Sequence, residues 1–235
     1  MFIRHATALV IIALISPVLF ADDAPNLIGK DFTGWKIKNP SASLWKVVAD
    51  VKMSPTNNKE LEPTGEPGET PLLVNDLKEK QHGSDIYTEK TFGDCEVHVE
   101  LLVPKGSNSG VYLQGRYEVQ VFDSFGKKTP GKGDLGGIYN TKEPTAEGYE
   151  PKPAGEWQTL DIVFQAPRFD DAGKKIANAR FVSVELNGKQ IQKNVEVPGP
   201  TGGELEKNES KTGPILFQGD HGPVAFRNLR VNEMK

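Results

Sequence analysis

The feature that most constrains the fold of this sequence is a period-two alternation of apolar and polar side chains. It is clearest in residues 95–103 and 111–122. Successive side chains of a β-strand point to opposite faces of a sheet, so this alternation predicts strands with one buried and one polar face. We find no amphipathic helix longer than about two turns. The chain is therefore expected to be built from β-strands.

Turn signals divide the chain into many short strands. Asn187-Gly188 lies between two strand-like runs, which is the strongest short hairpin signal, and a second turn is expected at Gly115-Arg116. The sequence therefore predicts an all-β jelly-roll sandwich of two antiparallel sheets, and a length of 235 residues suits one large domain over residues 22–235. Within it, residues 52–70 are rich in Pro, Gly, Glu and Thr and predict a mobile surface loop inserted into the domain.

The first 21 residues are predicted to be a signal peptide. An apolar run over residues 6–20 is short for a membrane span and precedes Ala21, which indicates export to the periplasm or beyond and no membrane span in the mature form. The formal charge of −4 argues against a nucleic-acid partner. Cys95 is the sole cysteine and stands at an alternating apolar position, so it is expected to be a buried small hydrophobe.

Polar and aromatic side chains gather on one face of the predicted pair of strands over residues 107–126. Tyr112, Gln114, Glu118 and Gln120 share this face, and Asp123 ends the second strand. Such groups suit a bound sugar. The site is therefore expected to take a small carbohydrate, although Asp123 could equally cap a turn.

Three titratable groups share one face of the strand over residues 95–103. Glu96, His98 and Glu100 could form a solvated outer face, an acid–base site or a site for a divalent cation. The strand that carries Glu118 is expected to lie next to this one. His221, between glycines near the C-terminus, could carry a proton near neutral pH.

Several segments resemble one family when taken in order. They are Asn108-Ser-Gly-Val-Tyr-Leu, Tyr117-Glu-Val-Gln-Val-Phe-Asp-Ser, Gly155-Glu-Trp-Gln, Asn187-Gly, Asp220-His-Gly and Phe226-Arg-Asn. Over residues 27–233 the chain resembles the 3-keto-disaccharide hydrolase, or 3-keto-glucoside lyase/hydratase, family, formerly domain of unknown function 1080. The resemblance implies a concanavalin A-like jelly roll. By position, the resemblance implies that the site residues are Glu100, Asn108, Ser109, Tyr117, Glu118, Gln120, Asp123 and His221.

The resemblance also implies a chemistry. A 3-keto group acidifies the hydrogen on C2 of the sugar, so a base can remove it, the C1 substituent leaves, and water then adds. We hypothesise Glu118 or Glu100 as the base, His221 as the proton carrier, and Asn108 or Arg116 near the carbonyl oxygen. A divalent metal in place of that electrophile is left open, and no other cofactor is expected. The alternatives are a two-carboxylate glycoside hydrolase and a carbohydrate-binding module.

Overall fold

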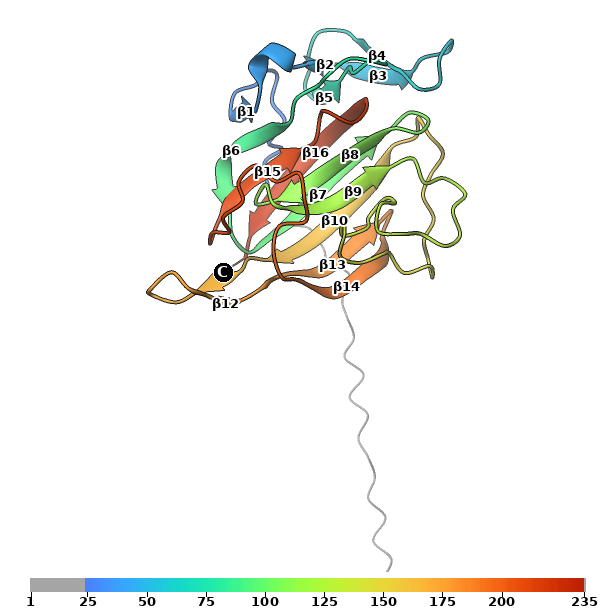
Figure 1. Cartoon of the computed structure of the whole chain (residues 1–235). Coiled ribbons are helices and arrows are strands. Elements are labelled where there is room, and N and C mark those ends of the chain that lie inside the picture. Colours follow the sequence, from blue (N-terminus) through green and yellow to red (C-terminus); the bar gives the residue numbers. More distant parts are fainter. Residues whose placement is uncertain (1–23, 235) are drawn as a thin grey trace, which may run out of the picture.

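The structure of this protein is a computed structural model that describes residues 24–234 (Figure 1). The predicted signal peptide over residues 1–21 lies outside the described residues, so export stays a prediction. Within residues 24–234, no helix has the length and apolar character needed to span a membrane. The one helix among these described residues is a single 3-10 turn, Pro40–Ala42.

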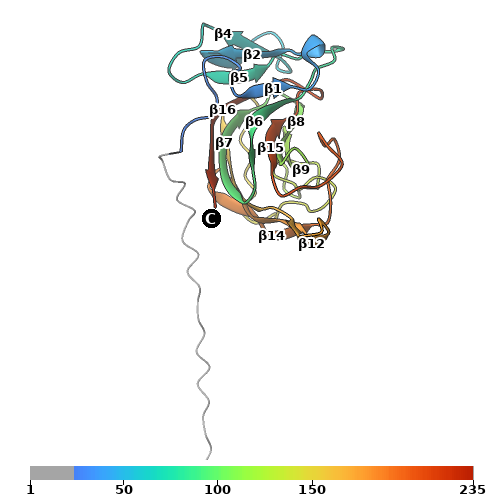
Figure 2. The ribbon, with the colours of Figure 1, turned by 90° about the vertical axis from the view of Figure 1, so that its left-hand side faces the viewer.

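Two antiparallel sheets make up the domain, which confirms the predicted all-β sandwich (Figures 1 and 2). The five-stranded sheet has the order β1 (Trp35–Ile37), β6 (Ile86–Phe92), β15 (Gly213–Phe217), β8 (Asn108–Leu113), β9 (Tyr117–Phe122). The seven-stranded sheet has the order β14 (Lys189–Val197), β13 (Ala179–Leu186), β10 (Gln158–Gln165), β7 (Cys95–Leu102), β16 (Val224–Glu233), β5 (Leu72–Asn75), β2 (Trp45–Val48). Two ribbons stand apart, β3 (Asp50–Met53) with β4 (Leu61–Thr64), and β11 (Arg168–Phe169) with β12 (Lys175–Ala177).

The core lies between the sheets and is built from the alternating apolar positions of both. Val97 and Val99 of β7 face Val119 and its neighbours from β9 in one continuous cluster. Across the sandwich, the rings of Phe217 and Phe226 stack with centroids 3.9 Å apart. Burying each such aromatic side chain stabilises the fold by roughly 1.5–3 kcal/mol. Cys95 is buried in the same cluster, as predicted.

Successive strands change sheets, which makes one sequence-based prediction wrong. β6 belongs to the five-stranded sheet, β7 to the seven-stranded sheet and β8 to the five-stranded sheet again. β9 pairs with β8 and never with β7. The strand that carries Glu118 is therefore not adjacent to the strand that carries Glu100.

The segment predicted as a mobile loop over residues 52–70 contains a strand that covers the outside of the sandwich. β3 and β4 form a hairpin at one end of the molecule, at the top of Figures 1 and 2. Leu61 and Val51 pack there in a second apolar cluster with Leu72 and Val74, whose neighbour Leu73 faces the main core. The sequence did not indicate this strand because few apolar residues mark the hairpin, yet one of them, Leu61, is fully buried; mobility of the rest of the segment stays a prediction.

Candidate active site

The hairpin of β8 and β9 carries the centre of the candidate site. Tyr112 lies opposite Glu118, and Gly110 lies opposite Gln120. Val119, between the two polar residues of β9, points into the core. Because side chains alternate along a strand, Tyr112, Glu118 and Gln120 project from the outer face of the five-stranded sheet.

Loops cover this polar face, which the sequence predicted to be open. Glu118 is only 2% exposed, and Gln120 is also buried. The loop after β9 lies along that strand, with the Gln120 N–H donating to the Gly137 carbonyl at 2.8 Å. The segment after β14 also reaches β9, where the Glu118 N–H donates to Thr201 Oγ1 at 3.0 Å. The site is therefore an enclosed one rather than a wet sheet surface.

Glu118 is a buried acid with a shifted proton affinity. The Tyr112 hydroxyl donates to Glu118 Oε2 at 2.8 Å, and a Cβ atom at Gly110 would lie 2.4 Å from Oε1. The pKa of Glu118 is raised to about 7, mainly by burial; the charges of Asp220 and Asp85 also raise it, and the bond from Tyr112 opposes them. Near neutral pH, Glu118 can therefore both accept and donate a proton.

The turn between β15 and β16 completes the site. His221 Nδ1 and Asp220 Oδ1 share a short hydrogen bond. A Cβ atom at Gly222 would lie 2.8 Å from the Asn108 nitrogen, so this turn packs against the start of β8. Asn108 Oδ1 in turn accepts a hydrogen bond from Gln120 Nε2 at 2.5 Å. The fold thus brings together four of the predicted residues, Asn108, Tyr112, Glu118 and Gln120, and packs the turn that carries His221 beside Asn108.

Burial decreases along the hairpin in one direction. Glu118 and Gln120 are almost fully buried, whereas Asn108 and Phe122, which pair at the far end, are partly exposed. The side chain of His221 is 51% exposed. The site therefore opens at the end where β8 begins and β9 ends, beside the His221 turn.

Glu100 lies on the opposite side of the molecule, so its predicted place in the site is wrong. Its neighbours on β7 face the core, and its carboxylate projects from the outer face of the seven-stranded sheet. It accepts hydrogen bonds from Asn228 and from Arg227 Nε, the latter at 2.7 Å. Burial alone would raise the pKa of Glu100, but these bonds outweigh burial and hold that pKa below its usual value. Glu100 is an ion-pair partner rather than a base near Glu118.

Two further predicted contacts have structural partners. Ser109 is fully buried, and its hydroxyl donates to the Gln218 carbonyl at 2.8 Å. Asp123 Oδ2 accepts from the Gly106 N–H at 3.0 Å and pairs with Lys105 at 3.0 Å. Burial raises the pKa of Asp123, yet these bonds outweigh it and leave the pKa below its usual value. Asp123 ties down the turn between β7 and β8, and a hydrogen bond with the Phe125 backbone joins it to the Ser124-Phe125-Gly126 turn, which favours the capping alternative.

Arg116 and Tyr117 hold the segment over residues 198–212, here called the strap. Arg116 Nη2 pairs with Glu206 at 3.0 Å, and Arg116 Nε donates to the Asn208 carbonyl at 2.7 Å. Tyr117 has its ring in the core and donates its hydroxyl to Glu209. The Arg116 guanidinium is therefore engaged with the strap instead of a substrate carbonyl.

Asp85 is a residue near the site that the sequence did not indicate. It is buried just before β6, where its Oδ1 accepts the Gly219 N–H at 3.1 Å. Its Oδ2 pairs with Lys38 at 3.1 Å. A single Asp ahead of a strand matches no motif, so only the fold shows that it lies close to Glu118.

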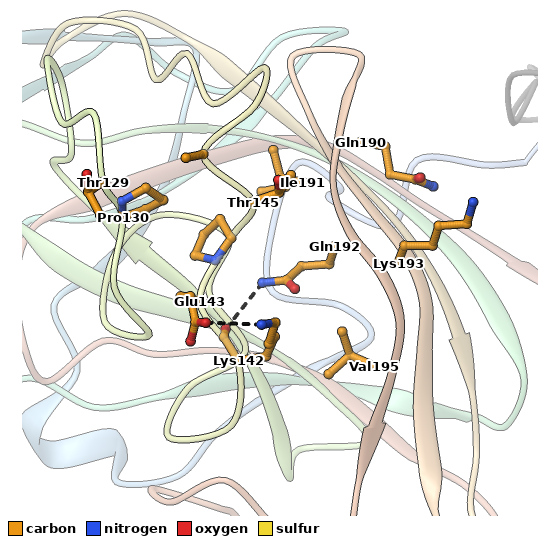
Figure 3. A pocket seen from close by; sticks show the side chains of 12 residues that line it. Thr129, Pro130, Lys142, Glu143, Thr145, Gln190, Ile191, Gln192, Lys193 and Val195 are labelled. Atoms are coloured by element: carbon orange, nitrogen blue, oxygen red, sulfur yellow. Dashed lines mark hydrogen bonds and ion pairs between the residues drawn. The ribbon is translucent and has the colours of Figure 1, made fainter.

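Two of the cavities within residues 24–234 are relevant to the position of the site. One of about 400 Å³ adjoins the opening and is lined in part by Lys105, Asp220 and His221. The other, of about 560 Å³, lies between β14 and the loops that precede β10 (Figure 3). There Gln192 Nε2 donates to the Lys142 carbonyl at 3.2 Å, and none of the predicted site residues lines it. Of the predicted site residues, only His221 lines the first of these two cavities.

The donor set does not fit a metal ion. Among residues 24–234, no three His, Cys, Asp or Glu side chains come together as ligands. His98 pairs with Asp161 on the outer face of the seven-stranded sheet, far from the hairpin in the fold. Within this part of the chain, the side chains around Glu118 therefore offer no set of metal ligands.

Comparison with known proteins identifies the family. The profile of the 3-keto-alpha-glucoside-1,2-lyase-like domain matches residues 19–232. The chain belongs to this family. The resemblance seen in the sequence is thereby confirmed, and 3-keto-alpha-glucoside-1,2-lyase-like domains are associated with carbohydrates.

Two solved structures are similar to this chain in fold. A candidate glycosyl hydrolase from Parabacteroides distasonis ATCC 8503 is 29% identical with a TM-score of 0.63, over 91% of this chain and 84% of that one. A second candidate glycosyl hydrolase from the same organism is 17% identical with a TM-score of 0.55, over 88% and 91%, and shows the fold alone. None of the curated proteins matches the chain.

Proposed function

We propose that this protein cleaves 3-keto-glycosides by elimination at C1, followed by addition of water. The observation that carries the proposal is the buried Glu118 carboxyl with its Tyr112 partner on the outer face of the five-stranded sheet. A base whose pKa lies near neutral pH is well matched to removing a carbon acid's proton. Membership of a 3-keto-glucoside lyase-like family supports the same substrate class.

The proposed reaction needs no cofactor, because each bond that breaks is matched by one that forms. Ionised Glu118 takes the proton from C2, and the electron pair of the C2–H bond is delocalised onto the 3-keto oxygen as an enolate. The enolate then collapses, forming a C1=C2 double bond while the bond between C1 and the leaving oxygen breaks. A proton passes to that oxygen. Water next adds across the double bond, giving the free 3-keto sugar.

The other residues have supporting roles. Tyr112 orients the Glu118 carboxyl through its 2.8 Å hydrogen bond. Gln120 fixes Asn108 by its amide, and within residues 24–234 the Asn108 Nδ2 makes no hydrogen bond, so it is free to donate to the enolate oxygen. His221, which lies beside Asp220 and is half exposed, is assigned in this proposal to protonate the leaving group.

The test uses phenyl 3-keto-α-glucoside with hydrogen or deuterium at C2. Wild-type protein is expected to release phenol, more slowly from the deuterated substrate because C2–H cleavage is part of the reaction. Glu118→Gln should lower kcat by roughly 10²–10⁴-fold. Glu185→Gln is the matched control, because burial also raises the pKa of that acid on the other sheet. An unchanged rate in Glu118→Gln would exclude Glu118 as the base.

The same assay separates the alternatives. Equal cleavage of the unoxidised phenyl glucoside would indicate a two-carboxylate glycosidase, which needs a second acid about 5 to 9.5 Å from the first. Glu100 cannot be that acid, because it lies on the other sheet. Sugar binding without cleavage of either glucoside would indicate a binding module.

A further inference from the structure

The turn that carries His221 is held in place by the buried carboxylate of Asp85. Asp85 Oδ1 accepts the Gly219 N–H at 3.1 Å. The contact between these segments is close, since a Cβ atom at Gly219 would lie 2.2 Å from the Ser84 carbonyl oxygen. β6 and β15, which follow Asp85 and precede Gly219, are neighbours in the five-stranded sheet (Figure 2). Asp85 is thus rigidly placed relative to the turn.

The segment around Asp85 is itself fixed by the N-terminal part of the domain. The Lys38 N–H donates to the Asp85 carbonyl at 3.0 Å, and the Lys38 ammonium pairs with its carboxylate at 3.1 Å. The Asn39 N–H donates to Ser84 Oγ at 2.8 Å, and the Trp45 indole donates to the Ser84 carbonyl at 2.6 Å. The position of this carboxylate is therefore determined by several hydrogen bonds.

Three groups act electrostatically on Glu118. Tyr112 donates a hydrogen bond to its carboxyl, while Asp220 and Asp85 bring negative charge toward it. Asp220 is shared with His221 at the exposed opening, and Asp85 is buried with Lys38 as its counter-charge. Asp220 makes the larger contribution of the two, and Asp85 adds to it from a buried position, where solvent screens a charge less.

We propose that Asp85 is a positioning residue of this site, which fixes the Gly219–His221 turn and holds a negative charge against the Glu118 carboxyl. This inference rests on the proposed function. Asp85 does not touch the substrate. Its effect on the reaction passes through the proton affinity of Glu118 and the placement of His221.

Two substitutions on either side of one ion pair give opposite expected results. Asp85→Asn keeps an oxygen for the Gly219 N–H but removes the negative charge, so ionised Glu118 is favoured and its pKa falls. Lys38→Met removes the positive charge that offsets Asp85, so ionised Glu118 is disfavoured and its pKa rises. The rising, acidic limb of kcat/KM against pH should move down in the first variant and up in the second, each by about half a unit.

The measurement has a substrate-free arm. Carboxyl carbons of glutamate are labelled, and the Glu118 signal, assigned by its loss in Glu118→Gln, is titrated by NMR in the wild type and both variants. Lys46→Met is the matched control, because Lys46 forms a comparable exposed ion pair with Asp76 at 2.6 Å. It should leave the titration and the pH profile unchanged.

Shifts of opposite sign support the proposal, since a merely structural role would alter both variants in the same direction. Equal titration of Glu118 in wild type and Asp85→Asn, or shifts of the same sign in the two variants, would overturn it. Failure of the wild type to cleave a 3-keto-glucoside, with opposite NMR shifts still present, would overturn the proposed function and keep the influence of Asp85 on Glu118.

Discussion

At the scale of single residues, burial of Glu118 links chemistry to stability. A carboxyl group enclosed by protein loses the water that would solvate its charge, and here one hydrogen bond from Tyr112 does not fully replace it. The folded protein therefore holds this proton more tightly than the unfolded chain does. Deprotonation of Glu118 must cost the folded state free energy.

The sign of this effect predicts a pH-dependent stability difference. The pKa of Glu118 is 4.5 in the unfolded chain and about 7 in the folded protein. The stability that protonated Glu118 contributes is therefore fully present below pH 4.5 and is lost as the pH rises through about 7. Wild type should lose this contribution between pH 4.5 and pH 8, whereas Glu118→Gln should not. The unfolding free energy of the variant minus that of wild type should therefore increase by about 3 kcal/mol over this range. Urea unfolding at the two pH values measures it. Parallel pH dependence in the two proteins would contradict the deep burial of an ionisable Glu118.

At the scale of elements, the strap covers the polar side chains that the β8–β9 hairpin presents. The Thr201 N–H donates to the Arg116 carbonyl at 3.0 Å, and the Leu205 N–H donates to the Gly115 carbonyl at 2.8 Å. A Cβ atom at Gly203 would lie 2.7 Å from the Tyr112 hydroxyl oxygen, so the strap passes directly over the partner of Glu118. Its attachment decides how well water is kept from the site.

Loss of the Arg116 side chain should loosen the strap before it unfolds the domain. Arg116→Met leaves the Asn208 carbonyl without its donor and is expected to cost roughly 1–3 kcal/mol of unfolding free energy. Amide hydrogen exchange at Leu205 should rise more than exchange in β10. Arg180→Met, which breaks an exposed pair with Glu196, is the control and should change little. Equal protection of Leu205 in both variants would contradict the anchoring role of Arg116.

The hairpins were predictable from the sequence, whereas the sheet that each strand joins, and its neighbours there, were not. Asn187 and Gly188 have φ values of 51° and 75°, as a tight two-residue turn requires, and they join β13 to β14 as predicted. Turn geometry is local, so the sequence carries it. The sheet that β7 joins depends on contacts far along the chain, and alternation is the same in either sheet. The polar face around Glu118 looked open for a similar reason, because irregular loops that cover it have no periodic signal.

At the scale of the whole molecule, the sandwich separates two acids that share a similar sequence pattern. Glu118 projects from the outer face of one sheet and Glu100 from the outer face of the other, with the core between them. Any sugar held against Glu118 is therefore out of reach of Glu100. The strands that carry these two acids are close in sequence but lie in different sheets.

Removal of the Glu100 charge should consequently affect stability and leave catalysis alone. Glu100→Gln weakens the pair with Arg227, whose guanidinium also lies 4.1 Å from the centroid of the Trp157 ring. We expect a loss of about 1–2 kcal/mol in thermal or urea unfolding, with kcat/KM for the 3-keto-glucoside within about two-fold of wild type. A 100-fold loss of activity in a folded variant would return Glu100 to the site.

The turn before β16 draws its shape from both layers of the sandwich. Asn75 of β5 donates through Nδ2 to the carbonyls of Gly219 and Gly222, each at 2.9 Å, and Asp85 holds the same turn from the segment leading into β6. A hairpin cut from this domain would therefore keep Glu118 but lose the geometry of His221. The site is a product of docking the two layers, so no single piece of the chain can carry it into another protein.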